Sequence, residues 1–497
     1  MLAALKANWI AAACVLFTLV NAALMAMGFN WFAVLPAVLL VAWAMVAAPE
    51  KLIVFIAFAT PLSINLEELD LGGIGVSLPT EPVMVGLMFL FLLKVCLQKN
   101  VIDPAVLRHP ITTIILLQLG WMLVCIVPSS MPLVSVKYFT ARLWFVCVLY
   151  FLGTRFFADT RHMARFAHAF LIGLVLTIGY TLTVHAQYDF AHDPAHWVMW
   201  PFFKDHTGYG AVIAFLVPFA VALVGMPGYS RTHRGLLVFV LIVLLLGLIF
   251  SYTRAAWLSL VGAIGVFLVL RFRIPGWALV LLLMTSGVTY YVNQEQITIY
   301  LERNREESSD NLGEHVQSIS NISSDASNLE RINRWHSALR MWQERPIFGW
   351  GPGTYMFQYA PFQASEDRTI VSTNFGVQGN AHSEYLGPLS EQGLFGMLLM
   401  VALVVVTISR ALRLYHRMPA GGDRRMMAAA FLGLITYYIH GALNNFLDTD
   451  KASVPFWAFT CMIVIFDLRY AAVRPTEAIL DLFHNSSAPS PWEKEKG

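Results

Sequence analysis

The feature that most constrains this chain is a series of long apolar runs that recurs over most of its 497 residues. A helix needs about 20 residues to cross the roughly 30 Å hydrocarbon core of a bilayer, and most of these runs are long enough. Backbone groups inside lipid must find hydrogen-bond partners within their own segment, so helices are expected rather than strands. Only 13% of the residues are charged, against about a quarter in soluble domains, which excludes a water-soluble globule.

We predict an all-α fold, a polytopic membrane helix bundle with about 12–14 transmembrane helices. The first run is too long for the apolar part of a signal peptide and others follow at once, so we interpret it as an uncleaved helix. The third and sixth runs are short for a span. The apolar runs are 8–28, 31–48, 51–64, 80–97, 110–128, 138–153, 165–185, 207–226, 235–252, 254–271, 275–291, 384–409, 425–446 and 453–468.

Lysine and arginine are distributed unequally between the two sets of connecting loops. If the amino terminus is cytoplasmic, the loops on that side hold most of the basic residues, as the positive-inside rule requires. The pattern predicts a multi-pass protein with both termini in the cytoplasm. We divide the chain into transmembrane helices (1–291), a large periplasmic loop (292–382), further transmembrane helices (383–468) and a cytoplasmic tail (469–497).

The large loop has two parts. Residues 302–330 are rich in Ser, Asn, Asp and Glu, a composition typical of a mobile segment. Residues 328–344 instead place apolar side chains at helical spacing, and Pro346 ends this pattern before a glycine-rich stretch. We therefore predict a partly helical loop. The apolar stripe consists of Leu329, Ile332, Trp335, Leu339 and Trp342.

The same loop contains seven arginines and no lysine. Arginine offers a planar fork of donors that matches phosphate or carboxylate oxygens and keeps its charge in a partly dry site. The alternative is that these arginines pair with acidic residues of the loop. Arg331 and Arg334 are the strongest candidates for an anionic ligand, because they share one helix face with Trp335. The seven are Arg303, Arg305, Arg331, Arg334, Arg340, Arg345 and Arg368.

Arg254 lies between two apolar runs at the predicted outer boundary of the membrane. It is either an interfacial arginine that extends to lipid headgroups or a functional residue, which is the default reading of an ionisable group at such depth.

His382 lies where the large loop enters the next predicted helix. A lone histidine is usually structural, but its pKa range also suits a general base that takes a proton from a hydroxyl. We expect it in the first helical turn, where free backbone N–H groups favour an anion.

Other polar residues stand at predicted outer helix ends. Asp205 or Thr207 either caps a helix or supports a site, and Asp448 either orients basic residues or is solvated. Lys137, Tyr138 and Arg142 form a further cluster of this kind. The possible supporting residues are Lys204, Asp205, His206, Arg142, Tyr385 and Asp448.

Several chemistries lack their minimum parts in this sequence. There is no HExxH motif, no CxxC pair and no pair of intramembrane carboxylates, and all five cysteines fall in apolar runs. The stretch from Gly349 to Gly353 lacks the Lys-Ser/Thr ending of a phosphate-binding P-loop. We therefore expect no metal, no cofactor and no nucleic-acid partner.

Three motifs in order carry a family resemblance. Thr253–Trp257 resembles an arginine motif at an outer helix end, Glu330–Trp335 followed by Pro346–Gly353 resembles a second arginine with a Pro and Gly turn, and Ala381–Leu386 with Glu391–Gly396 resembles a histidine motif. Together they resemble the superfamily of O-antigen ligases and O-antigen polymerases, bacterial membrane glycosyltransferases, and most closely a ligase. The family's histidine motif usually reads His-Asn, whereas here Ser383 follows the histidine.

The resemblance implies a glycan donor linked to polyprenyl pyrophosphate, such as undecaprenyl pyrophosphate, and an acceptor hydroxyl at the periplasmic face of the inner membrane. His382 would be the catalytic base. Arg254, Arg331 and Arg334 would bind the pyrophosphate and stabilise its charge as it leaves. Neither a metal nor a nucleotide sugar takes part.

Several functions remain open at this point. The leading one is ligation of the glycan to a lipid A-core acceptor. A repeat-unit polymerase and a protein O-oligosaccharyltransferase use the same donor and differ only in the acceptor, so the residues do not separate them. A glycan transporter or flippase belongs to a different class, but the broken midplane helices and related halves typical of transporters are not evident here.

Overall fold

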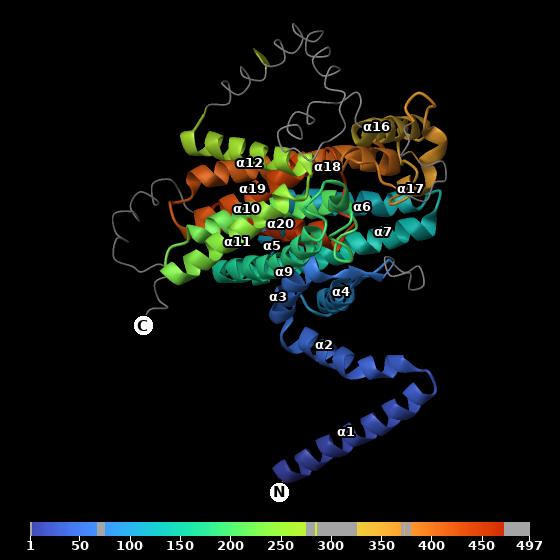
Figure 1. Ribbon diagram of the computed structural model, residues 1–497, viewed down its shortest axis with the longest axis vertical. Coiled ribbons are helices and arrows are strands. Elements are labelled where there is room, and N and C mark those ends of the chain that lie inside the picture. The colour runs from blue at the N-terminus through green and yellow to red at the C-terminus, as the bar shows by residue number, and fades with distance from the viewer. Residues whose placement is uncertain are drawn as a thin grey trace. The chain divides into compact units, whose positions relative to one another are not determined.

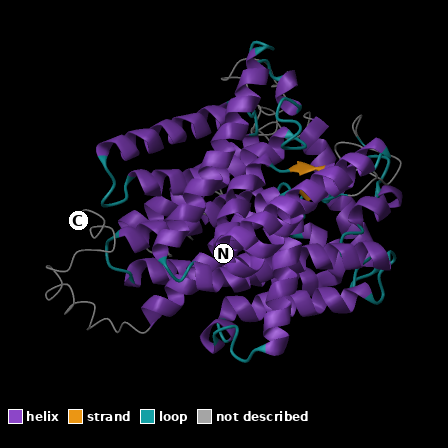
Figure 2. Cartoon of the chain, turned by 90° about the horizontal axis from the view of Figure 1, so that it is seen from below, coloured by secondary structure: helices purple, strands orange, loops and turns teal. Residues whose placement is uncertain are grey.

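A computed structural model describes residues 2–66, 75–274, 284–285, 326–368, 372 and 379–471. Of the described residues, 76% are helical. Figure 2 shows helices throughout and two short strands, β1 (Ile64–Asn65) and β2 (Ser77–Leu78), which pair antiparallel. The predicted all-α helix bundle is confirmed. The greater part of the predicted span 275–291, Arg303, Arg305 and the tail beyond residue 471 lie outside the described residues.

Residues 1–52 form one of two compact units. It contains α1 (Leu2–Ala26), the short 3-10 helix η1 (Asn30–Val34) and α2 (Leu35–Ala47). Gly28 has a φ of +82° between α1 and η1, a conformation that glycine adopts without steric cost. Phe17 of α1 stacks on Phe32 of η1 with ring centroids 5.3 Å apart.

The second unit, residues 53–497, holds the remaining helices, and most of its long helices run side by side (Figure 1). Its helical elements, in chain order, are α3 (Pro49–Ala59), which begins in the first unit, η2 (Thr60–Leu62), α4 (Thr80–Leu97), α5 (Pro104–Leu107), α6 (Pro110–Ile126), α7 (Pro132–Phe145), η4 (Val146–Leu152), α8 (Gly153–Phe156), α9 (Thr160–Ala186), η5 (Asp193–His196), α10 (His206–Val224), α11 (Arg231–Ile249), α12 (Arg254–Phe272), α16 (Ala326–Glu344), α17 (Tyr355–Gln358), η6 (Ala360–Phe362), α18 (Leu386–Arg417), α19 (Gly422–His440) and α20 (Asp450–Ala471).

Eight helices in the described part of the chain are long and apolar enough to cross a membrane. The same residues also contain three shorter apolar helices, Ala11–Ala26, Phe32–Ala47 and Pro110–Ile126. The number of about 12–14 spans stays a prediction. The sixth predicted run is long enough for a span, because α7, the π-helical η4 and α8 join into one apolar stretch over Pro132–Phe156. The third is not: α3 has 11 residues, about 16 Å of helix, and the 3-10 turn η2 with Pro61 follows it.

The centre of the second unit is formed by α10, α12, α19 and α20. Helices in lipid associate through close packing, and small residues allow that approach. A Cβ atom on Gly262 of α12 would lie 2.3 Å from the Ile439 side chain of α19, and one on Gly433 of α19 would lie 2.8 Å from the Phe215 carbonyl oxygen of α10. These contacts pack α10 and α12 closely against α19.

The helix α18 is broken near its start. Gly393 has φ 72° and ψ −173°, which no helix contains, and the break releases carbonyl groups from their usual partners. The backbone N–H groups of Trp350 and Gly351 donate to the carbonyl oxygens of Ser390 (3.0 Å) and Glu391 (2.9 Å). A chain segment, residues 346–353, is therefore fitted to this break, and we call it the glycine turn.

The glycine turn requires its glycines. Gly349, Gly351 and Gly353 all have positive φ, and a Cβ atom on Gly349 would lie 2.3 Å from the Glu391 carbonyl carbon. The Gly349 N–H donates to the Arg345 carbonyl (3.1 Å), so the turn also closes on the end of α16.

Candidate functional site

His382 lies in a tight turn, residues 379–385, which we call the histidine turn. Its φ is +47°, a left-handed conformation that non-glycine residues adopt rarely, histidine more often than most. The His382 N–H donates to Asn380 Oδ1 (3.1 Å), which is the local bond that makes asparagine favourable in turns.

The expectation that His382 lies in a first helical turn with free N–H groups is wrong. The helix α18 begins only at Leu386. The Ser383 hydroxyl accepts from the N–H groups of Tyr385 and Leu386, both at 3.3 Å, so these donors are engaged and do not present an open anion site. Ser383, which replaces the usual asparagine, therefore accepts from backbone N–H groups where α18 begins.

Glu384 fastens the histidine turn to the connection between α19 and α20. Its backbone N–H donates to the Gly441 carbonyl (2.7 Å). Its Oε1 accepts from the Tyr437 hydroxyl (2.6 Å) and from the N–H groups of Phe446 (2.8 Å) and Leu447 (2.9 Å). Burial raises the pKa of the Glu384 carboxyl, against the opposing hydrogen bond from Tyr437. The backbone around His382 is therefore held rigidly.

The ring of His382 contacts a side chain from that same connection. Its Nδ1 is 3.3 Å from Asn444 Oδ1, and Asn444 Nδ2 is 3.2 Å from His440 Nε2. Burial, reinforced by the charge of Arg331, lowers the pKa of His382 to about 4. The ring is thus neutral near neutral pH and can accept a proton.

The predicted amphipathic helix is confirmed as α16 (Ala326–Glu344), and it packs over the histidine turn. Trp335 Nε1 donates to the His382 carbonyl (3.2 Å), so this residue of the predicted apolar stripe fixes the two segments together. Arg331, one helical turn earlier, acts electrostatically on His382, and also on His206. Arg331 therefore lies where a positive charge serves the candidate site.

Arg334 has a different setting. Its Nε donates to Glu330 Oε1 (2.6 Å) in a buried ion pair, and its guanidinium lies 3.9 Å from the centre of the Tyr359 ring. Gly379 is close below it, since a Cβ atom there would lie 2.6 Å from Arg334 Nη1. This arginine, predicted as a pyrophosphate ligand, holds α16 and the histidine turn together.

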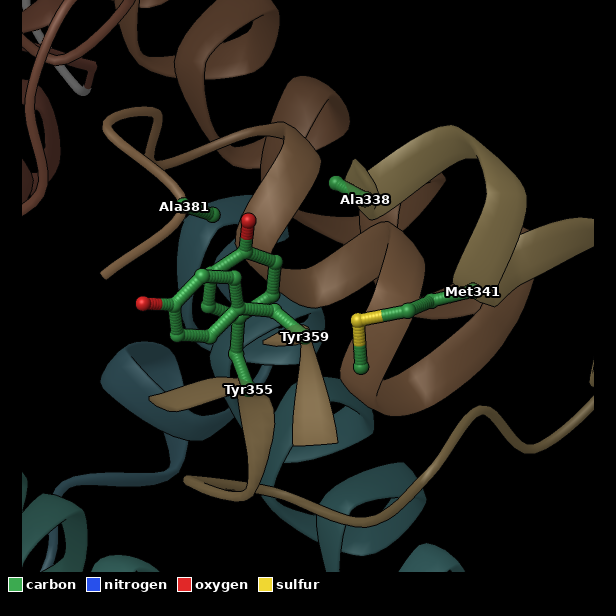
Figure 3. Close-up of a cluster of buried hydrophobic side chains, with 5 residues drawn as sticks. All are labelled: Ala338, Met341, Tyr355, Tyr359 and Ala381. Carbon is green, nitrogen blue, oxygen red and sulfur yellow. The ribbon is translucent and has the colours of Figure 1, made fainter. Parts of the chain in front are cut away.

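A small buried cluster supports Arg334 and the histidine turn (Figure 3). Tyr355 and Tyr359 stack with an interplanar angle of 6°, and the Tyr355 hydroxyl donates to the Arg334 carbonyl (2.8 Å). Aromatic rings combine large apolar area with a polar end that finds a partner. The cluster consists of Ala338, Met341, Tyr355, Tyr359 and Ala381.

Arg254 is the first residue of α12. The preceding Thr253 donates from its hydroxyl to the His206 carbonyl at the start of α10 (2.8 Å), and the charge of Arg254 acts on His192. Since Arg331 acts on His206, the two predicted arginines flank the same helix start.

Asp205 is a helix cap, as one of the two predicted readings held. Its Oδ1 accepts from the Gly208 N–H (2.8 Å) and from the Thr207 hydroxyl. Its negative charge also acts on His382, in opposition to Arg331. Asp205 therefore serves both the fold of α10 and the electrostatics of the site.

The other predicted supporting residues gather beside Glu384 and Asp448. Arg142 of α7 donates to the Tyr138 hydroxyl (3.1 Å) and acts electrostatically on Glu384. Lys204 and Asp448 are exposed. Tyr385 donates to the Tyr438 carbonyl (2.9 Å), which anchors the histidine turn to α19.

Sequence reasoning missed Asn444, His440 and Glu384. Asn444 stands in a pair of asparagines within an otherwise apolar segment, a signal that was available but was read only for Asp448. Among the described residues, no three His, Cys, Asp or Glu side chains could hold a metal ion.

The arrangement brings together a neutral imidazole and the positive charge of Arg331, with a second arginine near the start of α10. A base of this kind can take a proton from a hydroxyl while nearby arginine stabilises an anionic leaving group.

A family model described as O-antigen ligase matches residues 238–401. The match contains Arg254, Arg331 and His382 and ends within α18. No curated protein matches the chain significantly. The family indicates a glycosyltransferase-like enzyme in O-antigen processing, whose partners in general are lipid-linked glycans and glycolipids. The match over residues 238–401 confirms the resemblance of the chain to the O-antigen ligase and polymerase superfamily.

Proposed function

We propose that this protein transfers a glycan from a polyprenyl-pyrophosphate carrier to an acceptor hydroxyl, and that the acceptor is lipid A-core. The observation that carries the proposal is the position of His382. Its ring is neutral, its backbone is fixed by Trp335 and Glu384, and the charge of Arg331 acts on it.

In the proposed reaction, the acceptor oxygen attacks the anomeric carbon of the donor. The bond between that carbon and the pyrophosphate oxygen breaks, and the carrier leaves with the bonding electron pair. The hydroxyl proton passes to His382, a step that typically contributes about 10²–10⁴ in rate. Arg331 and Arg254 offset the negative charge that grows on the pyrophosphate.

Arg334 receives a supporting role in this proposal. Its guanidinium is already paired with Glu330 and stacked on Tyr359, so binding pyrophosphate would require breaking a buried ion pair, which is costly. We assign it to holding α16 in place, with Arg331 presented one turn earlier.

Reconstitution tests the proposed function. Purified protein in liposomes is supplied with a polyprenyl-pyrophosphate-linked glycan as donor. Separate reactions contain one acceptor each: lipid A-core, a second carrier-linked repeat unit, or a candidate acceptor protein. Glycosylated lipid A-core is the expected product. Product only with a second carrier-linked unit would identify a polymerase, and product only with protein would identify a protein glycosyltransferase. Movement of intact donor across the bilayer without transfer would identify a flippase.

We propose the inner membrane as the location, with both termini cytoplasmic and the site on the periplasmic side. The support is the excess of basic residues in one set of loops. To test this orientation, the exposed Cys14 and Cys96 are first replaced, and a single cysteine is then introduced at Gln343 or at Ala420. Both variants are labelled in intact spheroplasts. An impermeant reagent should label position 343 and not position 420. The reverse pattern would invert the topology.

A further inference from the structure

His382 can act as a base through only one of its two ring nitrogens at a time, because a neutral imidazole carries a proton on the other. Nε2 makes no hydrogen bond to any described residue, whereas Nδ1 faces Asn444 Oδ1 at 3.3 Å. An amide oxygen only accepts hydrogen bonds. The contact is therefore favourable only when Nδ1 carries the proton and Nε2 is free.

The direction of this contact depends on which way the Asn444 amide faces. With the opposite orientation, its NH₂ group would point at Nδ1 and favour the other tautomer. His440 supports the first orientation, because its Nε2 lies 3.2 Å from Asn444 Nδ2 and accepts from the amide N–H when His440 carries its own proton on Nδ1. The order of donors is thus His382 Nδ1–H to Asn444 Oδ1, and Asn444 Nδ2–H to His440 Nε2.

Both partners are built into the fold. Asn444 is 2% exposed and His440 1% exposed. His440 ends α19, and the Asn444 N–H donates to the His440 carbonyl (3.0 Å), so the two side chains are held on one turn of backbone. Glu384 ties that same segment to the histidine turn through the Phe446 and Leu447 N–H groups.

We propose that Asn444, oriented by His440, is a positioning residue that fixes His382 in the Nδ1–H tautomer and leaves Nε2 as the base. The inference rests on the proposed function. Where the family usually has an asparagine directly after the histidine, this chain has Ser383. Asn444 contributes an amide from a different part of the fold. During transfer, the acceptor proton binds to Nε2, and the imidazolium keeps its Nδ1–H bond to Asn444.

A neutral amide differs from an acidic partner in its effect on the pKa of His382. The charged groups that act on His382 are Arg331 and Arg334 from α16 and Asp205 before α10. An aspartate in place of Asn444 would put a carboxylate in direct contact with Nδ1, which raises a histidine pKa by about 1–3 units. Asparagine therefore orients the ring without making it cationic.

The first test compares Asn444→Ala, Asn444→Asp and the control Asn445→Ala in the reconstituted transfer assay. Asn445 is the adjacent amide, and its Oδ1 accepts no hydrogen bond within the described residues. Asn444→Ala should lower kcat at least about tenfold with the donor KM unchanged, because tautomer control is lost. Asn444→Asp should keep most of kcat and move the acidic limb of kcat/KM upward by about 1–3 pH units. Asn445→Ala should match wild type.

The second test does not need activity. Nitrogen-15 NMR of histidine-labelled protein, with the His382 signals assigned by their loss in His382→Gln, reports which ring nitrogen carries the proton. Wild type should show the Nδ1–H tautomer, whereas Asn444→Ala and His440→Phe should show a mixture. An Nε2–H tautomer in wild type, or an unmoved pH limb in a folded Asn444→Asp variant, would overturn the inference. If wild type transfers no glycan yet shows the Nδ1–H tautomer, the proposed function fails and the positioning contact stands.

Discussion

Two turns, the glycine turn and the histidine turn, pack against the beginning of α18. Both contain residues with positive φ, but this conformation serves a different purpose in each turn. In the glycine turn, positive φ values let N–H groups of Trp350 and Gly351 meet the carbonyls of the broken helix. In the histidine turn, positive φ at His382 directs a ring whose Nδ1 faces Asn444. In the first turn the positive φ values fall on glycines and fit a helix break without strain, whereas in the second a histidine takes the strained conformation and positions a reactive group. The difference teaches that a positive φ indicates a functional site only where the residue also has a side chain that can take part in a reaction.

The largest expected effect tests whether the histidine turn carries the reacting group. His382→Ala should lower transfer by about 10²–10⁴ because the base is lost, while expression and thermal unfolding stay close to wild type. The rate is measured in single-turnover reactions with saturating donor, so that donor affinity is scored separately.

The matched control is His336→Ala on the exposed side of α16, where His336 pairs with Asp367 (3.0 Å). It should transfer at the wild-type rate. Unchanged transfer in His382→Ala would remove the histidine from the mechanism. Weakened donor binding that His382→Lys partly restores would instead make it a cationic contact to pyrophosphate.

The next effect separates the two arginines of α16 that lie near the histidine turn. Arg331→Lys keeps the charge but loses the planar fork, so transfer should fall by about 10²-fold with little change in unfolding temperature. Arg334→Ala should instead unfold more easily, by about 3–5 kcal/mol, because Glu330 loses its buried ion pair with the guanidinium. Transfer rates and thermal unfolding in detergent are measured for both variants.

The two arginines would exchange roles if the results were reversed. Wild-type turnover in Arg331→Lys with severe loss of donor binding in a stable Arg334→Ala variant would make Arg334 the pyrophosphate ligand. Arg340→Ala is a useful control, since Arg340 pairs with Asp367 at the partly exposed surface (2.7 Å) and such pairs contribute little.

Much of this contrast was predictable from the sequence. The apolar runs and the helix predicted over 328–344, which is α16, follow from local patterns, whereas the position of His382 ahead of α18 does not. The break at Gly393 did not, because the apolar run continues through it. Asn444 was missed for another reason: it meets His382 across 62 positions of chain, and such a contact leaves no spacing to read.

A smaller effect probes the glycine turn by itself. Gly349→Ala should destabilise the protein by at least about 1–2 kcal/mol, because its φ of +65° is unfavourable for alanine and the new Cβ atom meets the Glu391 backbone. Thermal unfolding in detergent measures the loss. Transfer per folded molecule should remain near wild type, since the turn holds no reacting group.

Gly265→Ala, within α12, is the matched control. No atom lies within 4 Å of its added Cβ, and alanine favours a helix over glycine by about 1 kcal/mol. The comparison would fail if Gly349→Ala lost transfer while remaining as stable as the control, because the glycine turn would then take part in the reaction.

The smallest expected effect is a difference between two pH profiles. In the free enzyme, burial and the charge of Arg331 lower the pKa of His382 to about 4. The base form therefore predominates above that pH, and kcat/KM should fall only as the pH drops through about 4. Bound pyrophosphate neutralises Arg331, which removes one cause of the low pKa. The acidic limb of kcat, which reports the complex with donor, should therefore lie at a higher pH than that of kcat/KM.

Arg331→Gln should raise the limb of kcat/KM, whereas Arg331→Lys, which keeps the charge, should leave it in place. Coincident limbs near the ordinary imidazole pKa of about 6.5 would show that His382 is not the group that these profiles report, and the contrast between the two turns would then rest on geometry alone.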